Sequence, residues 1–501
     1  MNKIIATSVA KNTVIQFGQQ IATWISSFLL MLFLPRILGP ERFGRIYLAE
    51  MVTAIFIVLV MYDGRLSIVR RVSRNREHAA EILSNSLGFR AALWLLAFIV
   101  MMVFGYAAHY PASVIVILFL FGVEMTWVAM RTVLSGIYLG FENTTYTAVG
   151  AIAERMFIAG VGIAALLLGG TEITIAVVMI IGTLLNFIIC ARYIGRFVGK
   201  LPRINWHASW ILMKEGFPFL LWTIFGMIYY RIDTVMLSLM TTEKVVGWYG
   251  ASYRFYDVLA FLPSIFTLAI LPVLSKLFDR DQPMLVVTTR KSLNFILFTG
   301  IPISISIYFF SREIIGFLFG LGGYGPSVIN LQLFAVGLIL LYIDMVLGTA
   351  IIACNQQKQL AWIAFIALIV NVGLNYFMIP YAQARTGNGG IGAAIATLIT
   401  EFVVLLSNLL ILDRSILKDA DSSVFLKAIL GGAVMLIAQI VLAGSGLGLY
   451  WMLQAAVGFG IYLSVLLALK TFSRAEIDFV REFVSIRNIR QSLSSRKTDA
   501  Q

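Results

Sequence analysis

The stretch FPFLLWTIFGMIYYRIDTVMLSLM, residues 217–240, is long and apolar enough to cross a lipid bilayer as a helix. It nevertheless carries Arg231 and Asp233 near its middle. A charged side chain at the bilayer centre costs roughly 2.5–3.5 kcal/mol on insertion scales, so such residues mark solute pathways or partners on other helices. The stretch therefore predicts a polytopic membrane protein that moves a polar or charged solute.

The composition agrees with this prediction. Of the 501 residues, 60% are hydrophobic and 13% are charged, whereas a soluble domain has about 25% charged residues. The apolar residues form about fourteen runs of membrane-spanning length. Because a bilayer leaves the backbone of such runs no hydrogen-bond partner except within a helix, we predict an all-α fold with spans near 13–34, 46–62, 86–108, 112–139, 146–168, 172–195, 217–240, 247–274, 292–310, 327–352, 359–380, 391–412, 424–444 and 448–469.

Positive charge is spread unevenly over the predicted loops. The net charge is +13, and cytoplasmic loops hold the excess of Lys and Arg in membrane proteins. With the N-terminus placed inside, most loop cations fall on the cytoplasmic side, and the opposite side holds only Arg36, Arg42, Arg45, Lys244, Arg312 and Arg385. We therefore expect both termini in the cytoplasm. Residues 474–490 are expected to form an amphipathic helix on the inner leaflet or a disordered tail.

Signals for several other functions are missing from the sequence. Cys190 and Cys354 are the only cysteines and form no CxxC pair, and the three histidines are far apart. We therefore expect no disulfide framework, no metal centre and no cofactor. The chain also has no phosphate-binding GxxxxGK[ST] motif. The energy for transport would then come from an ion gradient, from the substrate gradient or from a partner subunit.

Two stretches, one after the first predicted span and one after the seventh, resemble each other. Residues 39–49 (GPERFGRIYLA) and 243–251 (EKVVGWYGA) each contain an acid, a base, a glycine, and then Tyr and Ala. Internal repeats build many transporters. Because the copies are six spans apart, they have the same orientation. We expect lobes at 1–212 and 213–415, two further spans within 416–470, and a cytoplasmic tail at 471–501.

Polar residues recur inside the predicted spans. Gln16, Gln20, Thr23 and Ser27 form one stripe along the first helix, which predicts a cavity wall or hydrogen bonds between helices. Opposite charges in spans either pair to lock helices or line a path, and locking is favoured for Glu401 and for Glu154 with Arg155. Arg254 and Asp257 are spaced to pair along one helix.

Arg231 and Asp233 lie about 200° apart around a helix, so they cannot simply pair with each other. Arginine binds phosphate bidentately, and carboxylates inside a membrane can exchange protons or hold Na⁺. We therefore predict a cation-coupled exporter of a phosphorylated species. The expected substrate-binding residues are Arg231, Arg254, Arg131, Gln16 and Gln20, and the expected ion-coupling residues are Asp233, Asp257, Glu124 and Asp344.

Four motifs stand in order along nearly the whole chain. They are LGPERFG at 38–44, DTVML at 233–237 followed by VGWY at 246–249, LPVLSK at 271–276 and GGIGAAIAT at 389–397. These motifs resemble those of the polysaccharide (O-antigen and exopolysaccharide) repeat-unit flippases. This Wzx-type family belongs to the multidrug/oligosaccharidyl-lipid/polysaccharide (MOP) exporter superfamily.

The resemblance implies a two-lobed, V-shaped transporter in the bacterial cytoplasmic membrane. It would turn an oligosaccharide on undecaprenyl pyrophosphate from the inner to the outer leaflet by alternating access, coupled to H⁺ or Na⁺. The implied partners are the lipid-linked substrate, the ion, membrane lipids, and polysaccharide polymerase and chain-length proteins, without nucleic acid. Trp222, Tyr229 and Tyr230 would stack on sugars or serve in packing.

Three alternatives remain at this point. A peptidoglycan-precursor flippase also has fourteen spans, whereas a multidrug antiporter usually has twelve spans and a more acidic cavity. A membrane enzyme of polysaccharide assembly would carry a sizeable outer loop with catalytic residues. The longest predicted outer segments, 311–326 and 381–390, are short and lack histidine or paired acids, so we do not expect an enzyme.

Overall fold

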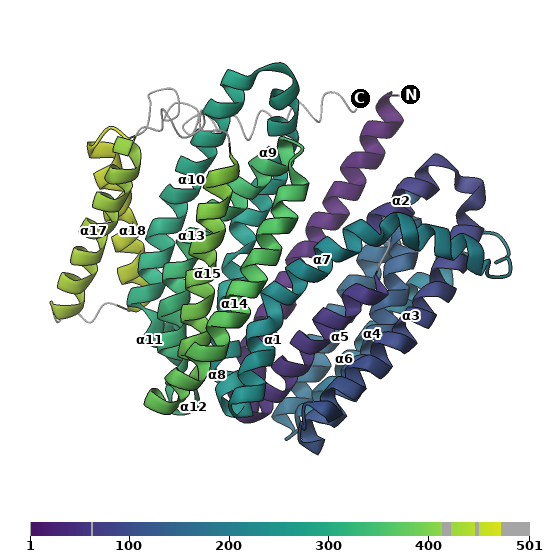
Figure 1. Cartoon of the computed structure of the whole chain (residues 1–501), viewed down its shortest axis with the longest axis horizontal. Helices are drawn as coiled ribbons and strands as arrows, with labels where there is room; N and C mark the ends of the chain where they lie inside the picture. Colours follow the sequence, from purple (N-terminus) through teal and green to yellow (C-terminus); the bar gives the residue numbers. More distant parts are fainter. Residues whose placement is uncertain (1, 62–63, 413–421, 446–449, 472–501) are drawn as a thin grey trace, which may run out of the picture. The chain divides into compact units, whose positions relative to one another are not determined.

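The computed structural model describes residues 2–61, 64–412, 422–445 and 450–471. Within these ranges every regular element is a helix (Figure 1). The predicted all-α fold class is therefore confirmed. The predicted amphipathic helix at 474–490 and the rest of the tail lie outside the described residues.

The described chain forms two compact units, which are considered separately. Unit 1 comprises residues 1–259, 311–337 and 356–408. Its helices are α1 (Asn2–Val60), α2 (Gly64–Arg74), η1 (Arg76–His78), α3 (Ala79–Ala107), α4 (Ala112–Gly140), α5 (Thr145–Leu167), α6 (Glu172–Ile194), α7 (Trp206–Met240), α8 (Glu243–Leu259), α11 (Ser311–Leu318), α12 (Leu321–Tyr324), α14 (Gln357–Thr386) and α15 (Gly389–Ile411).

Unit 2 comprises residues 260–310, 338–355 and 409–501. Its helices are α9 (Phe261–Arg280), α10 (Gln282–Phe309), α17 (Ser422–Gly444) and α18 (Trp451–Ala468), while α13 (Ser327–Ala353) contributes to both units. Leu297 and Ile301 of α10 pack against Met435 of α17 and Tyr462 of α18 in its apolar core. The lobes expected at 1–212 and 213–415 stay a prediction.

Twelve helical segments of the described residues are long and apolar enough to cross a membrane. The first, Ile15–Val60, contains two predicted spans on either side of Gly39. The seventh predicted span lies in α7. The eighth is interrupted at Ala260, between α8 and α9. With these adjustments, every predicted span corresponds to a helix.

The first two predicted spans meet at a sharp kink. Gly39 has φ 75° and ψ 169°, values outside the helical region, and only glycine adopts a positive φ without steric cost. The next residue, Pro40, has no N–H to donate to the preceding turn. In the same segment the Tyr324 hydroxyl of α12 donates to the Pro35 carbonyl at 2.9 Å. The Gly-Pro pair and α12 therefore define the bend together.

The two repeated stretches of sequence pack against each other where α1 crosses α8. A methyl group on Gly44 would overlap the carbonyl oxygen of Glu243, and one on Gly247 would overlap the carbonyl oxygen of Pro40. Each carbonyl belongs to the residue four positions before the opposite glycine, so the contact is reciprocal. Without side chains at these positions, the two backbones can approach closely, as in other small-residue contacts between membrane helices.

Candidate functional site: charged residues where α1, α7 and α8 meet

Arg231 of α7 pairs with Asp257 of α8, the Arg231 Nη1 atom lying 3.2 Å from Asp257 Oδ2. The guanidinium also lies over the ring of Tyr253, 5.8 Å from its centroid. The side chains of Arg231 and Asp257 keep 20% and 34% of their surface exposed. The pair therefore remains open on one side to water or a solute.

Arg254 of α8 pairs instead with Glu50 of α1. Its guanidinium lies 5.0 Å from the centroid of Phe43 and 5.9 Å from that of Tyr47, both on α1. Tyr47 reaches α8 because Gly250 leaves room for its ring. The pairing expected between Arg254 and Asp257 along one helix was wrong, because each of them finds its partner on a neighbouring helix.

Asp233 is buried and has no arginine partner among the described residues. Its Oδ2 accepts a hydrogen bond from the Tyr249 hydroxyl of α8, and its Oδ1 accepts one from the Thr234 N–H at 2.7 Å. The prediction that Arg231 and Asp233 do not pair with each other, and that at least one has a partner on another helix, agrees with these contacts. We call Glu50, Arg231, Asp233, Arg254 and Asp257 the central cluster.

A second group of charges lies between α4, α5 and α6. Arg131 Nε is 3.8 Å from Glu154 Oε2, and Asn186 donates to the same carboxylate at 2.5 Å. Glu154 therefore locks helices together as expected, although its partner is Arg131 rather than Arg155. Arg155 and Glu124 form no ion pair with any described residue. Glu124 lies close enough to Arg131, Glu154 and Arg155 to interact with them electrostatically.

The structure gives fewer contacts for the remaining predicted site residues. Glu401 is buried and accepts a hydrogen bond from the Tyr229 hydroxyl at 2.9 Å, which joins α15 to α7 through a neutral partner rather than through the expected pairing of opposite charges. Gln16 is exposed and Gln20 half-buried on α1. Asp344 is buried in unit 2. Among the described residues, no group of His, Cys, Asp and Glu is arranged to hold a metal ion.

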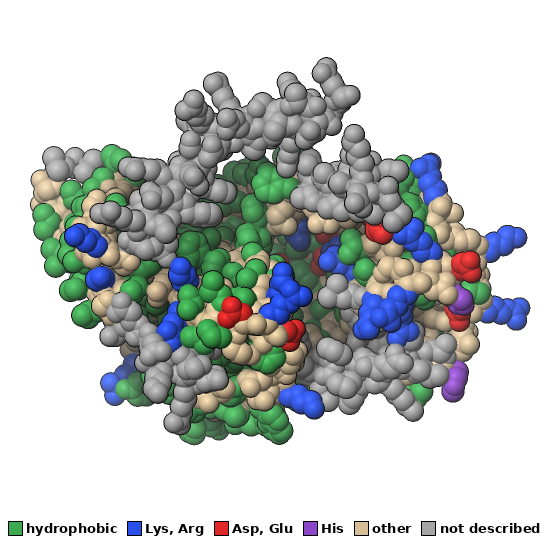
Figure 2. Space-filling model, turned by 90° about the horizontal axis from the view of Figure 1, so that it is seen from above, with side chains coloured by type: hydrophobic (Ala, Val, Ile, Leu, Met, Phe, Trp, Pro, Cys, Tyr) green, Lys and Arg blue, Asp and Glu red, His purple; other side chains and the backbone are tan. Residues whose placement is uncertain are grey.

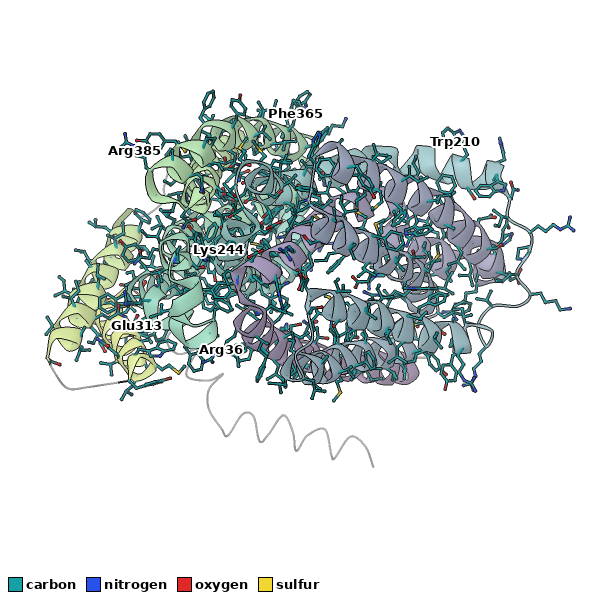
Figure 3. All side chains as sticks on the ribbon, turned by 90° about the horizontal axis from the view of Figure 1, so that it is seen from below. Arg36, Trp210, Lys244, Glu313, Phe365 and Arg385 are labelled. Carbon is teal, nitrogen blue, oxygen red and sulfur yellow. The ribbon has the colours of Figure 1, made fainter. Side chains whose placement is uncertain are left out.

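A third charged group surrounds Arg45 at the other end of the α1–α8 crossing. The Arg45 guanidinium lies 2.9 Å from Glu172 of α6, 2.6 Å from Glu41 of α1 and 4.0 Å from Glu243 of α8. Beside it is an open pocket of about 560 Å³, lined in part by Gly39, Lys244 and Gly323. Figure 3 views this end of the chain and labels Lys244. Arg45 therefore ties α1, α6 and α8 together.

Sequence reasoning missed some of these partners. Glu50 is an acid near the start of a predicted span, but its pairing with Arg254 appears only once α1 and α8 are packed. Tyr249 lies in the repeated stretch 243–251, and its role as the partner of Asp233 appears only once α7 and α8 are packed. Asn186 is an ordinary polar residue in an apolar helix, and only its contact with Glu154 distinguishes it.

The twelve helical segments of the described residues that are long and apolar enough to cross a membrane define a multi-pass membrane protein, and unit 1 keeps charged residues inside it. The chain belongs to the polysaccharide biosynthesis protein family, whose model matches residues 9–278. No functionally curated protein matches the sequence.

The fold is that of MOP-superfamily transporters. The lipid II flippase MurJ, in an inward closed conformation, matches with a TM-score of 0.74 at 18% identity, over 91% of this chain and 98% of that one. An inward-facing multidrug resistance MATE transporter matches with a TM-score of 0.61 at 14% identity, over 80% and 96%. A MATE transporter of Vibrio cholerae matches with a TM-score of 0.53 at 12% identity, over 82% and 99%.

Proposed function

We propose that this protein is a flippase for undecaprenyl-pyrophosphate-linked oligosaccharide repeat units. It moves them from the inner to the outer leaflet of the bacterial cytoplasmic membrane by alternating access, with both termini in the cytoplasm. The family match supports a role in polysaccharide biosynthesis. The observation that carries the substrate class is the pair of partly exposed arginines, Arg231 and Arg254, in the central cluster.

These arginines suit a pyrophosphate because neither is fully used by its acidic partner. A guanidinium has five N–H donors, and Asp257 accepts one hydrogen bond from Arg231. Arginine also binds phosphate oxygens in a planar, bidentate way and stays charged when partly desolvated. A pyrophosphate that reaches the cluster would compete with Asp257 and Glu50 for the same two guanidinium groups.

That competition offers a link to ion coupling. With all side chains ionised, the central cluster holds three carboxylates and two guanidinium groups. An anionic substrate entering such a site adds to the negative charge, which favours uptake of H⁺ or Na⁺ by a carboxylate. Asp233 is the proposed coupling residue, because its hydrogen bonds come from a hydroxyl and a backbone N–H rather than from an arginine.

The decisive experiment reconstitutes the purified protein in liposomes that contain a fluorescent lipid-linked oligosaccharide. Transfer between leaflets is measured by the access of a membrane-impermeant reagent. We expect wild-type protein to move the substrate and Arg231→Gln to lose this activity. In cells, gene deletion should cause complete repeat units to accumulate on the inner leaflet. Loss of sugar synthesis itself would contradict the proposal.

A lipid II flippase is the second candidate, because the fold matches MurJ over nearly the full length of both chains. The same liposomes separate the two functions when they contain lipid II instead. Transfer of lipid II in preference to the oligosaccharide lipid would favour the second candidate. Transfer of a soluble cationic drug with neither lipid would indicate a multidrug antiporter.

A further inference from the structure

Helix α2 (Gly64–Arg74) is a short amphipathic helix that follows directly after α1. One face carries Ile68 and Val72, which are buried in the core of unit 1. The opposite face carries the exposed Arg70 and Arg74, Arg65 is exposed in the first turn of the helix, and the exposed Arg76 follows in η1. The helix therefore separates an apolar face turned into the protein from a basic face turned away from it.

Close contact with α4 fixes the orientation of α2. A methyl group on Gly136 would lie 2.9 Å from Ile68 Cγ2, and one on Gly140 would lie 2.6 Å from Val72 Cβ. These distances leave no room for a side chain on α4. The two glycines thus form a notch that receives α2, and the position of the arginines is set by this packing.

A second basic segment shares the same core. Val198, in the loop between α6 and α7, belongs to the cluster that contains Ile68 and Val72. Around it the segment exposes Arg192, Arg196, Lys200 and Arg203, and residues 190–207 contain no acid. We call these four side chains, together with Arg65, Arg70, Arg74 and Arg76, the basic face. Figure 2 looks onto this end of the chain and shows Lys and Arg gathered over the right-hand part.

We propose that the basic face binds the headgroups of anionic phospholipids. Position argues for lipid, because α2 begins within four residues of the end of a membrane-spanning helix and so lies at headgroup level. Basic clusters beside a membrane span or on an amphipathic helix attract anionic lipids. Few acids oppose the charge: Glu142 pairs with Arg76 at 3.3 Å, and Glu77 is the only exposed acid in residues 64–81.

Positive charge on the cytoplasmic side would direct topology without any folded arrangement. Here, two segments more than a hundred residues apart are brought to one face by a shared core and a glycine notch. This arrangement suits binding of several headgroups side by side. The proposed binding of lipid headgroups does not depend on which solute the transporter carries.

The test uses full-length protein in phosphatidylcholine liposomes that contain spin-labelled phosphatidylglycerol or spin-labelled phosphatidylcholine. Electron paramagnetic resonance gives the relative association of each lipid with the protein. We expect wild-type protein to prefer phosphatidylglycerol at low salt and the preference to weaken as salt screens it. The triple variant Arg65→Gln, Arg70→Gln, Arg74→Gln should lose most of this preference. Each arginine is expected to raise the relative association with phosphatidylglycerol roughly fivefold.

Two matched variants separate the basic face from net charge. The triple variant Arg36→Gln, Arg312→Gln, Arg385→Gln removes the same charge from exposed positions on other elements and should keep the preference. Changing Arg65, Arg70 and Arg74 to lysine should also keep it. If the first triple variant does not fold, the single variant Arg70→Gln replaces it in the test. This single variant should weaken the preference for phosphatidylglycerol severalfold.

Three results would overturn the proposal. The first is an unchanged preference in the glutamine variants of α2. The second is an equal loss in the matched triple variant, which would indicate a response to net charge alone. The third is loss of the preference when inorganic phosphate replaces chloride at equal ionic strength, which would identify a site for soluble phosphate.

Discussion

The guanidinium of Arg231 and the carboxylate of Asp257 lie 3.2 Å apart on adjacent helices. Each could interact with a solute, because 20% and 34% of their side-chain surfaces are exposed. The pair contributes to the contact between α7 and α8, and it is also the proposed place where a pyrophosphate would bind. The two roles make different predictions for single and double substitutions.

Neutralising Arg231 should abolish lipid transfer while leaving the protein in the membrane. Arg231→Gln removes the proposed phosphate ligand, so we expect at least a tenfold loss in the liposome assay. The double variant Arg231→Gln, Asp257→Asn removes the uncompensated carboxylate as well. The double variant should regain the thermal stability that the single variant loses, but it should not regain lipid transfer. Recovery of transfer by the double variant would show that the ion pair only holds the helices together.

Asp233→Asn should change the ion dependence of transport. The substitution keeps the size of the side chain but removes the charge that a cation would neutralise, so we expect transfer to become insensitive to H⁺ and Na⁺ gradients. Tyr249→Phe removes the hydroxyl that bonds Asp233 and should weaken the dependence in part. The measurement is the transfer rate in liposomes with imposed gradients. An unchanged gradient dependence in Asp233→Asn would place coupling elsewhere.

Gly247→Ala should destabilise the protein by about 1–3 kcal/mol, the usual cost of overpacking. Its methyl group would overlap the Pro40 carbonyl oxygen, so α1 and α8 must separate. Gly44→Ala should behave in the same way, because the contact is reciprocal. The matched control is Gly373→Ala in α14, where nothing lies within 4 Å. Thermal unfolding in detergent gives the unfolding midpoint of each of the three variants. Equal midpoints would contradict the close contact between α1 and α8.

Arg45→Gln should loosen the contact between α1, α6 and α8. It breaks three ion pairs, each worth about 0.2–1 kcal/mol when partly exposed. In a background with Cys190→Ala and Cys354→Ala, a cysteine introduced by Ala251→Cys reports opening, because Ala251 is buried on α8. We expect severalfold faster labelling by a thiol reagent in Arg45→Gln. The exposed Arg36→Gln serves as control and should label at the parent rate.

Much of the candidate site could be predicted from sequence, but its pairing could not. Arg231, Asp233, Arg254 and Asp257 are conspicuous because charge is costly inside an apolar run. Their partners depend on how neighbouring helices are rotated and spaced. Arg254 lies one helical turn from Asp257, yet it pairs with Glu50, because the glycines of α8 bring α1 within reach.

The sequence by itself determined that the chain is a helical membrane protein, since apolar runs of about 20 residues satisfy the backbone's hydrogen bonds in a bilayer by forming helices. It also determined which charges are exceptional. Only the tertiary structure decided that Gly44 and Gly247 face each other, that Asp233 bonds Tyr249, and that the basic segments at 65–76 and 192–203 pack on one apolar cluster. These relationships depend on packing between residues far apart in sequence, and the periodicity of a single helix does not specify its neighbour.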